Sequence, residues 1–177
     1  IRVSKKLLEQ FYTENKRVIK TRKEEDLWEF LSLEKNVLSI KEGIDISGSY
    51  LAGGIATFIR MQLLNQGRYF SFETVMSRHD KISFLELAKQ NQYFIKLFFI
   101  TTSDPKINIR RIQNRVKFGG HDVPADKVES RYYQTLDQLS HALKYADEAY
   151  LFDNSYNKVQ LVAKIINGKD IEIEKGT

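Results

Sequence analysis

Positively charged side chains at helical spacing are the residues of this chain best suited to chemistry. Arg111 and Arg115 lie four residues apart, so on a helix they share one stripe, and two guanidinium groups on one stripe can chelate adjacent phosphates. The pair Gly119-Gly120 then offers a flexible hinge, and His121 and Arg131 continue the basic surface beyond it. This order predicts a lid that grips an anion and excludes water on closure. A solvated helix face has the same charge pattern, so the spacing alone leaves both interpretations open.

A second group of candidate residues follows segments that have the composition of β-strands. Residues 68–74 end in Glu73 and Thr74, and the apolar residues 149–152 are followed by Asp153 and Asn154. Because open α/β sheets bind ligands at the carboxyl ends of their strands, a carboxylate there can orient a substrate hydroxyl, and an asparagine can contact a base or ribose. Ordinary turn and cap residues are the alternative interpretation.

The segments that must position these residues alternate between helix and strand. Residues 93–100 are nearly all apolar or aromatic, which is typical of a strand buried on both faces of a parallel sheet. Further strands are predicted over 36–40, 68–74 and 149–152, and residues 158–174 predict a hairpin with a type I′ turn at Asn167-Gly168. Helical periodicity predicts helices over 3–20, 24–33, 47–65, 82–90, from Asp104-Pro105 to the glycine pair, and from Pro124 to near Asp147.

These elements predict an α/β fold, a parallel sheet flanked by helices. We expect a helical insertion over 1–46, a core with the lid over 47–156 and a β-hairpin over 157–177. Two glycines inside the predicted helix, Gly53-Gly54, cost about 1 kcal/mol each relative to alanine, which predicts close packing there against a strand or a ligand.

Composition narrows the function classes. The chain has 177 residues with a 42% hydrophobic content, enough for one domain with a sizeable core. It has no cysteine and three scattered histidines, which excludes disulfides and thiolate metal sites. The net charge of +5 suits a nucleotide-binding enzyme as readily as a nucleic-acid binder, and we regard nucleic acid as the less favoured partner. Without an apolar run of about 18 residues or a secretory signal, the sequence predicts a cytoplasmic protein with no membrane partner.

Several segments together resemble a known family, the zeta toxin-like P-loop kinases, which include relatives of the UDP-N-acetylglucosamine kinases of bacterial toxin–antitoxin systems. The resemblance covers roughly residues 47–156, and its most specific part is the run Gly-Gly-His-Asp-Val-Pro with its flanking arginines. The matching segments are residues 70–77, residues 111–124, Arg131-Tyr132, Ala146-Asp147 and residues 152–155.

The resemblance implies a P-loop NTPase-like fold and an ATP- and Mg²⁺-dependent kinase. Its substrate would be a small hydroxyl-bearing molecule such as UDP-N-acetylglucosamine, and its protein partner an antitoxin. By position in the motifs, the implied catalytic residues are Arg111, Arg115 and Glu73. The implied substrate contacts are Glu73, Thr74, Ser77 and Arg78. The implied nucleotide contacts are Arg111, Arg115, His121, Arg131, Asp153 and Asn154.

One part of the family pattern is missing from these residues. No Gly-x-x-x-x-Gly-Lys-Ser/Thr run is present, the catalytic aspartate is not identifiable, and neither Gly48-Ser49 nor Gly53-Gly54 is followed by Lys-Ser/Thr. We therefore expect the phosphate loop, the base and the magnesium site upstream of Ile1. The alternatives are a non-catalytic module that binds nucleotides, anions or nucleic acid, and an inactive remnant that serves as an interaction partner.

Overall fold

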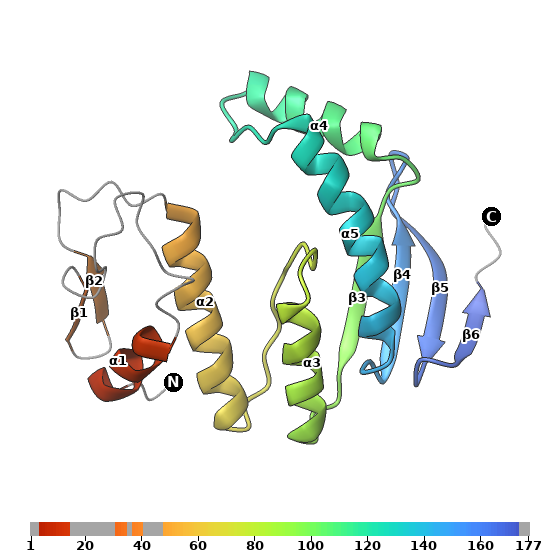
Figure 1. Cartoon of the computed structure of the whole chain (residues 1–177). Helices are drawn as coiled ribbons and strands as arrows, with labels where there is room; N and C mark the ends of the chain where they lie inside the picture. The colour runs from red at the N-terminus through yellow and green to blue at the C-terminus, as the bar shows by residue number, and fades with distance from the viewer. Residues whose placement is uncertain (1–3, 15–30, 35–36, 41–47, 174–177) are drawn as a thin grey trace. The chain divides into compact units, whose positions relative to one another are not determined.

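The chain forms two compact units, Ile1–Phe72 and Glu73–Thr177 (Figure 1). A computed structural model describes residues 4–14, 31–34, 37–40 and 48–173. The sequence had placed its first boundary near residue 47. Each unit is described separately below.

The first unit contains two helices and a small hairpin. Helix α1 (Lys5–Glu14) and helix α2 (Gly48–Asn65) flank an antiparallel pair, β1 (Leu31–Glu34) and β2 (Val37–Ile40). The strand predicted at 36–40 is confirmed over Val37–Ile40. The helix predicted over 24–33 is wrong where it can be compared, because Leu31–Glu34 is a strand whose ladder pairs with β2, and this pairing overrides the helical spacing of its apolar residues. Residues 15–30 lie outside the described part, as does the end of the helix predicted over 3–20.

Helix α2 confirms the long helix predicted at this position and ends as predicted at Gly67. The amide of Gly67 donates to Leu64 O and that of Arg68 to Leu63 O, both at 3.0 Å, and Gly67 has φ +61°. This is a Schellman motif, which favours glycine at the left-handed position. The predicted close packing at the glycine pair is wrong for Gly53, since a Cβ built there meets nothing within 4 Å.

The second unit is a mixed α/β structure. Its strands lie in the order β3 (Lys96–Thr101), β4 (Glu148–Asp153), β5 (Gln160–Ile166) and β6 (Asp170–Ile173). The β3–β4 pair is parallel, as predicted for the core, and the β5–β6 pair is the predicted hairpin. Because β5 joins the same sheet antiparallel to β4, the sheet is mixed and not wholly parallel. The hairpin turn is confirmed: Asn167 and Gly168 have φ +51° and +65°, and Lys169 N donates to Ile166 O at 3.1 Å.

The helices of the second unit are α3 (Asp80–Gln90), α4 (Pro105–Lys117) and α5 (Ala125–Leu143), which confirm the three predicted there (Figure 1). Side chains of α3 and α5 pack on the face of the sheet that carries Phe99, in a core with Met76, Ile82 and Ala142. On β3 the side chains of Phe98 and Ile100 are 60% and 59% exposed. Burial on both faces was therefore a wrong prediction for β3, because both of these helices cover the same face.

Residues 68–77 form no regular structure, which corrects the strand predicted over 68–74. The aromatic run there includes Tyr69, whose side chain is fully exposed. Strand-forming residues adopt a strand only where a partner offers ladder bonds and a packing surface, and no described strand pairs with this segment. Glu73 and Thr74 therefore belong to a loop that leads into α3, not to a strand end.

Candidate functional site

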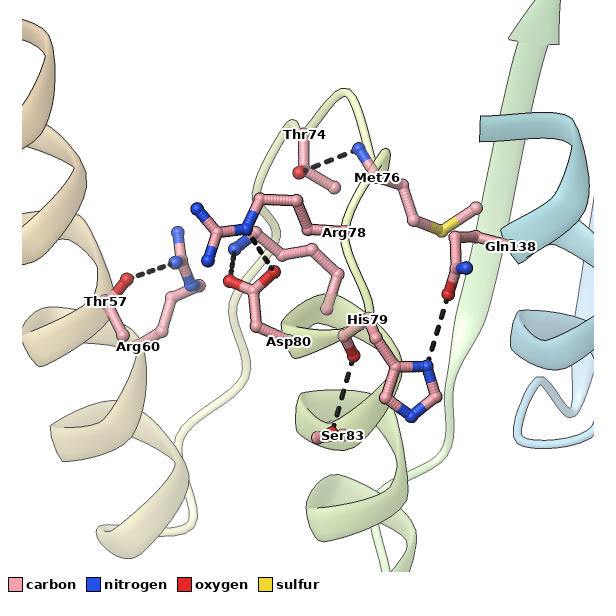
Figure 2. A network of polar contacts seen from close by, with 10 residues as sticks. Thr57, Arg60, Thr74, Met76, Arg78, His79, Asp80, Ser83 and Gln138 are labelled. Carbon is pink, nitrogen blue, oxygen red and sulfur yellow. Dashed lines mark hydrogen bonds and ion pairs between the residues drawn. The ribbon is translucent and has the colours of Figure 1, made fainter. Parts of the chain in front are cut away.

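The loop from Glu73 to His79 is held in a defined shape by contacts with α5 and with the core. The Thr74 hydroxyl accepts a hydrogen bond from Met76 N at 3.1 Å (Figure 2). The Thr135 hydroxyl of α5 donates to Val75 O at 2.7 Å. Met76 has φ +54°, a backbone conformation that is costly for a residue other than glycine. Met76 is only 5% exposed, so its burial in the core helps to offset this cost. Burial of Met76 and the two threonine bonds thus hold a strained loop in place.

A pocket of about 190 Å³ lies beside this loop. It brings together four residues that the sequence had singled out, Thr74, Ser77, Arg78 and Arg131, of which the last comes from α5. It also contains two charged residues of the first turn of α3 that sequence reasoning missed, Asp80 and Lys81. Val75 and Met76 complete the lining.

Positively charged side chains outnumber negatively charged ones around the pocket. The Asp80 carboxylate forms ion pairs with Lys81 and, at 3.8 Å, with Arg78. The Lys81 side chain is only 23% exposed, whereas that of Arg78 is 77% exposed. Among the residues that the structure describes, none forms a hydrogen bond or ion pair with the Arg131 guanidinium. Three cations facing one carboxylate leave an excess of two positive charges, which favours an anionic ligand.

The predicted lid consists of α4 and α5, and its base is fixed to the end of β3. The Asp104 side chain caps α4 by accepting from Lys106 N at 2.8 Å, with Pro105 at the first helical position, as predicted. The buried Thr102 hydroxyl accepts from the Asn108 amide at 3.0 Å, and the Tyr132 hydroxyl donates to Thr102 O at 2.7 Å. These bonds tie both lid helices to the same strand end.

The glycine pair ends α4 with a second Schellman motif. Gly119 has φ +82° and its amide donates to Val116 O at 2.9 Å, while Gly120 N donates to Arg115 O at 3.0 Å. A Cβ at Gly120 would overlap the Arg115 side chain and lie 2.9 Å from Arg115 O. The geometry of the helix end therefore requires the glycine pair.

The predicted lid cations have different surroundings. Arg115 donates to the backbone carbonyl of His121 at 2.8 Å, so it helps to close the turn after α4, and the His121 side chain is exposed. Arg111 is exposed and, among the described residues, has no side-chain partner. Of the two arginines that the sequence placed on one stripe of α4, Arg111 is thus the one that is free to meet a ligand.

Asp153 and Asn154 lie at the carboxyl end of β4, as predicted, beside the end of β3. Asn154 N donates to Thr101 O at 2.7 Å. One Asp153 oxygen accepts from Ser155 N at 2.8 Å and from the Ser155 hydroxyl, which lies 3.0 Å from the Ser103 hydroxyl. The Asp153 carboxylate is thereby occupied in a turn that pins the two strand ends together.

The remaining predicted residue, Glu73, is exposed and does not line the pocket. The structure therefore unites four of the ten predicted residues in one pocket. It gives four others a structural contact, Arg115 and His121 at the end of α4 and Asp153 and Asn154 at the end of β4, and it leaves Arg111 and Glu73 exposed. Within the described ranges, no three histidine, aspartate or glutamate side chains lie close enough to hold a metal ion.

Asp147, which lies in one of the segments matching the resemblance, has a structural role. Its carboxylate accepts from Ile95 N and from the Lys89 ammonium, both at 2.7 Å. Burial alone would raise the pKa of Asp147, but these hydrogen bonds and the charge of Lys89 outweigh it and hold the pKa below its ordinary value. Asp147 therefore links α3 to the starts of β3 and β4.

Comparisons with known proteins reveal one partial relative. No protein family model matches the chain, and no solved structure matches it. An uncharacterized protein of Haemophilus influenzae is 36% identical over 63 residues, which cover 36% of this chain and 45% of that protein. The match thus spans less than half of the relative. None of the helices within the described residues is both long and apolar enough to cross a membrane.

Proposed function

We propose that this chain carries the lid and the substrate pocket of a zeta toxin-like, P-loop NTPase-like kinase. The enzyme would transfer phosphate from ATP to a hydroxyl group of a small anionic substrate such as UDP-N-acetylglucosamine. One observation carries the proposal: Arg131, on lid helix α5, lines the same pocket as Thr74, Ser77 and Arg78. A lid cation and the candidate substrate contacts therefore act on one ligand.

The position of the lid supports this proposal. Helix α4 begins immediately after β3, and β3 pairs in parallel with β4, so the lid stands at the carboxyl ends of the parallel pair. Open α/β sheets bind ligands at this edge. The network of Thr102, Asn108 and Tyr132 gives the lid a firm base, so that α4 and α5 present their cations from fixed positions.

The chemistry assigned to the lid is electrostatic. In phosphoryl transfer, charge spreads over the oxygens of the transferred group, and an arginine that meets it contributes a factor on the order of 10³–10⁵ in rate. Arg111 is free to do so, whereas Arg115 must give up its bond to His121 O or serve by closing the turn. Thr74 and Ser77 offer hydroxyls and Arg78 offers a cation to the substrate. Among the described residues, none is assigned as a magnesium ligand, and none is assigned as the catalytic base.

A second candidate function uses the same pocket without catalysis. The excess of two positive charges around a pocket of about 190 Å³ also suits a module that only binds anions.

Phosphorus NMR separates the two functions. The protein expressed from its complete reading frame is incubated with ATP, Mg²⁺ and UDP-N-acetylglucosamine, and a new phosphomonoester resonance is expected. Anion binding at the pocket without any transfer to a panel of sugar nucleotides would leave only the binding module. Titration in increasing salt then distinguishes a small-anion site from nucleic-acid binding, whose affinity falls steeply and linearly in log salt.

A further inference from the structure

We propose that the pocket beside the Thr74–Lys81 loop recognises a phosphate group that the substrate already carries, and that Asp80 occupies the place of that group until the substrate binds. The identity of the ligand as a kinase substrate rests on the proposed function. The anion site and its internal carboxylate do not, because they follow from the side chains of the pocket.

The size of the pocket favours a single charged group. Pockets that enclose a whole drug-sized ligand have volumes of about 300–1,000 Å³, whereas this pocket has about 190 Å³. A nucleotide sugar does not fit inside it, but one phosphate group does. The rest of such a substrate would extend outward from the pocket.

The donors around the pocket match a phosphate. Arg78 and Arg131 can each bind two oxygens of one phosphate, and Lys81 adds a compact charge. Because the Thr74 hydroxyl accepts its hydrogen bond from Met76 N, its own proton remains available to a ligand oxygen. The Thr135 bond to Val75 O fixes the loop in advance, so little ordering is needed on binding.

Asp80 already satisfies two of the three cations. Its carboxylate pairs with Lys81, whose side chain is mostly buried, and with Arg78 at 3.8 Å (Figure 2). Each phosphate of the diphosphate in UDP-N-acetylglucosamine carries one negative charge, as a carboxylate does, but the diphosphate offers more oxygens to guanidinium groups, so it can compete for the same cations. Asp80 loses little when it is displaced, because it lies in the first turn of α3, where the helix dipole favours a negative charge. The carboxylate thus acts as a built-in competitor that discriminates against weaker anions.

Binding of inorganic phosphate to the full chain, followed by calorimetry, tests this inference. Arg131→Ala removes an exposed side chain without a described partner, and we expect it to weaken phosphate binding by about tenfold or more. Asp80→Asn removes the competitor, and we expect it to tighten phosphate binding by about tenfold and to let acetate bind measurably. Asp126→Asn is the matched control, since Asp126 also lies in the first turn of a helix but does not line the pocket. It should leave phosphate affinity unchanged.

Arg131→Ala and Asp80→Asn should change the phosphate affinity in opposite directions, so a general loss of folding cannot produce this result. Phosphate binding that Arg131→Ala leaves unchanged, or that Asp80→Asn weakens or leaves unchanged, would overturn the inference. Competition of phosphate with UDP-N-acetylglucosamine but not with N-acetylglucosamine identifies the substrate's own phosphate as the ligand. Equal competition with both sugars, or with neither, would contradict that assignment.

The transfer reaction separates this inference from the proposed function. Phosphoryl transfer that proceeds equally well on acceptors with and without a phosphate group overturns the phosphate pocket and leaves the kinase standing. The expected pattern of phosphate affinities without transfer to any acceptor overturns the kinase and leaves the pocket with its Asp80 competitor standing.

Discussion

The Tyr132 hydroxyl donates a hydrogen bond of 2.7 Å to the backbone carbonyl of Thr102, and this bond joins lid helix α5 to the end of β3. Thr102 is 4% exposed, so water cannot easily replace the Tyr132 hydroxyl as the donor to this carbonyl. Its hydroxyl also accepts from Asn108 of α4. The positions of both lid helices therefore depend on one threonine at a strand end.

Tyr132→Phe should destabilise the second unit by about 1–3 kcal/mol, because it leaves a buried carbonyl without its main donor. Tyr133→Phe is the matched control, since the neighbouring ring is 53% exposed and its hydroxyl has no described partner. That change should cost less than about 0.5 kcal/mol. Urea denaturation monitored by circular dichroism measures both. Equal losses in the two variants would show that the Tyr132 bond does not hold the lid.

Gly120→Ala should destabilise the turn after α4 by about 1–3 kcal/mol, because a Cβ there overlaps the Arg115 side chain. Two backgrounds isolate the cause. Arg115→Ala and Arg115→Met both remove the bond to His121 O, but only methionine keeps the overlapping Cγ. The cost of Gly120→Ala should fall in the Arg115→Ala background and persist in the Arg115→Met background. Part of the cost should remain in both backgrounds, because the new Cβ lies 2.9 Å from the backbone oxygen of residue 115. A cost that is the same in all three backgrounds would rule out the overlap as its cause.

Asp147→Asn should destabilise the chain at neutral pH by about 1.5–3 kcal/mol, because the carboxylate accepts from Ile95 N and Lys89. The pKa of Asp147 is lowered in the fold from an ordinary value of 3.8. A lowered pKa means that the carboxylate stabilises the fold fully above the unfolded pKa, and that this contribution is lost as the pH falls through the folded pKa. The difference in unfolding free energy between the two proteins should therefore be constant near neutrality and shrink below about pH 4.

Denaturant titrations at neutral pH and at about pH 3 measure this difference. Asp137→Asn serves as the control, because Asp137 is exposed and its carboxylate has no described partner. A gap between wild type and Asp147→Asn that widens on acidification would contradict the assignment.

The elements that were predictable from the sequence are those whose ends are decided by local chemistry. Asp104-Pro105 starts α4 and Asn167-Gly168 turns the final hairpin because these residues suit their backbone conformations wherever they occur. Leu31–Glu34 and residues 68–74 were predicted wrongly because strand formation depends on a partner. Leu31–Glu34 has one in β2, whereas the aromatic residues of 68–74 have none among the described strands.

The candidate site shows the same division. Arg111 and Arg115 were correctly placed on a helix from their spacing, and Arg131 on the next one. Their different roles could not be inferred, because the bond from Arg115 to His121 O depends on the path of the turn. Asp80 and Lys81 were missed because a charged pair in a first helical turn is common on solvated surfaces. Only the tertiary contact between the loop and α5 turns them into pocket residues.

Arg111→Ala should lower kcat for phosphoryl transfer by a factor on the order of 10³ while changing KM little, if the lid meets the charge that develops in the transition state. Arg110→Ala is the matched control, since Arg110 is also exposed on α4 but points about 100° around the helix. Both variants remove one surface cation and no described side-chain contact, so their stabilities should match. Steady-state kinetics on the protein from the complete reading frame, with denaturation curves for each variant, measure the effect. If the two variants lose activity equally, the lid acts only through its overall charge, and the stripe of Arg111 and Arg115 has no specific role.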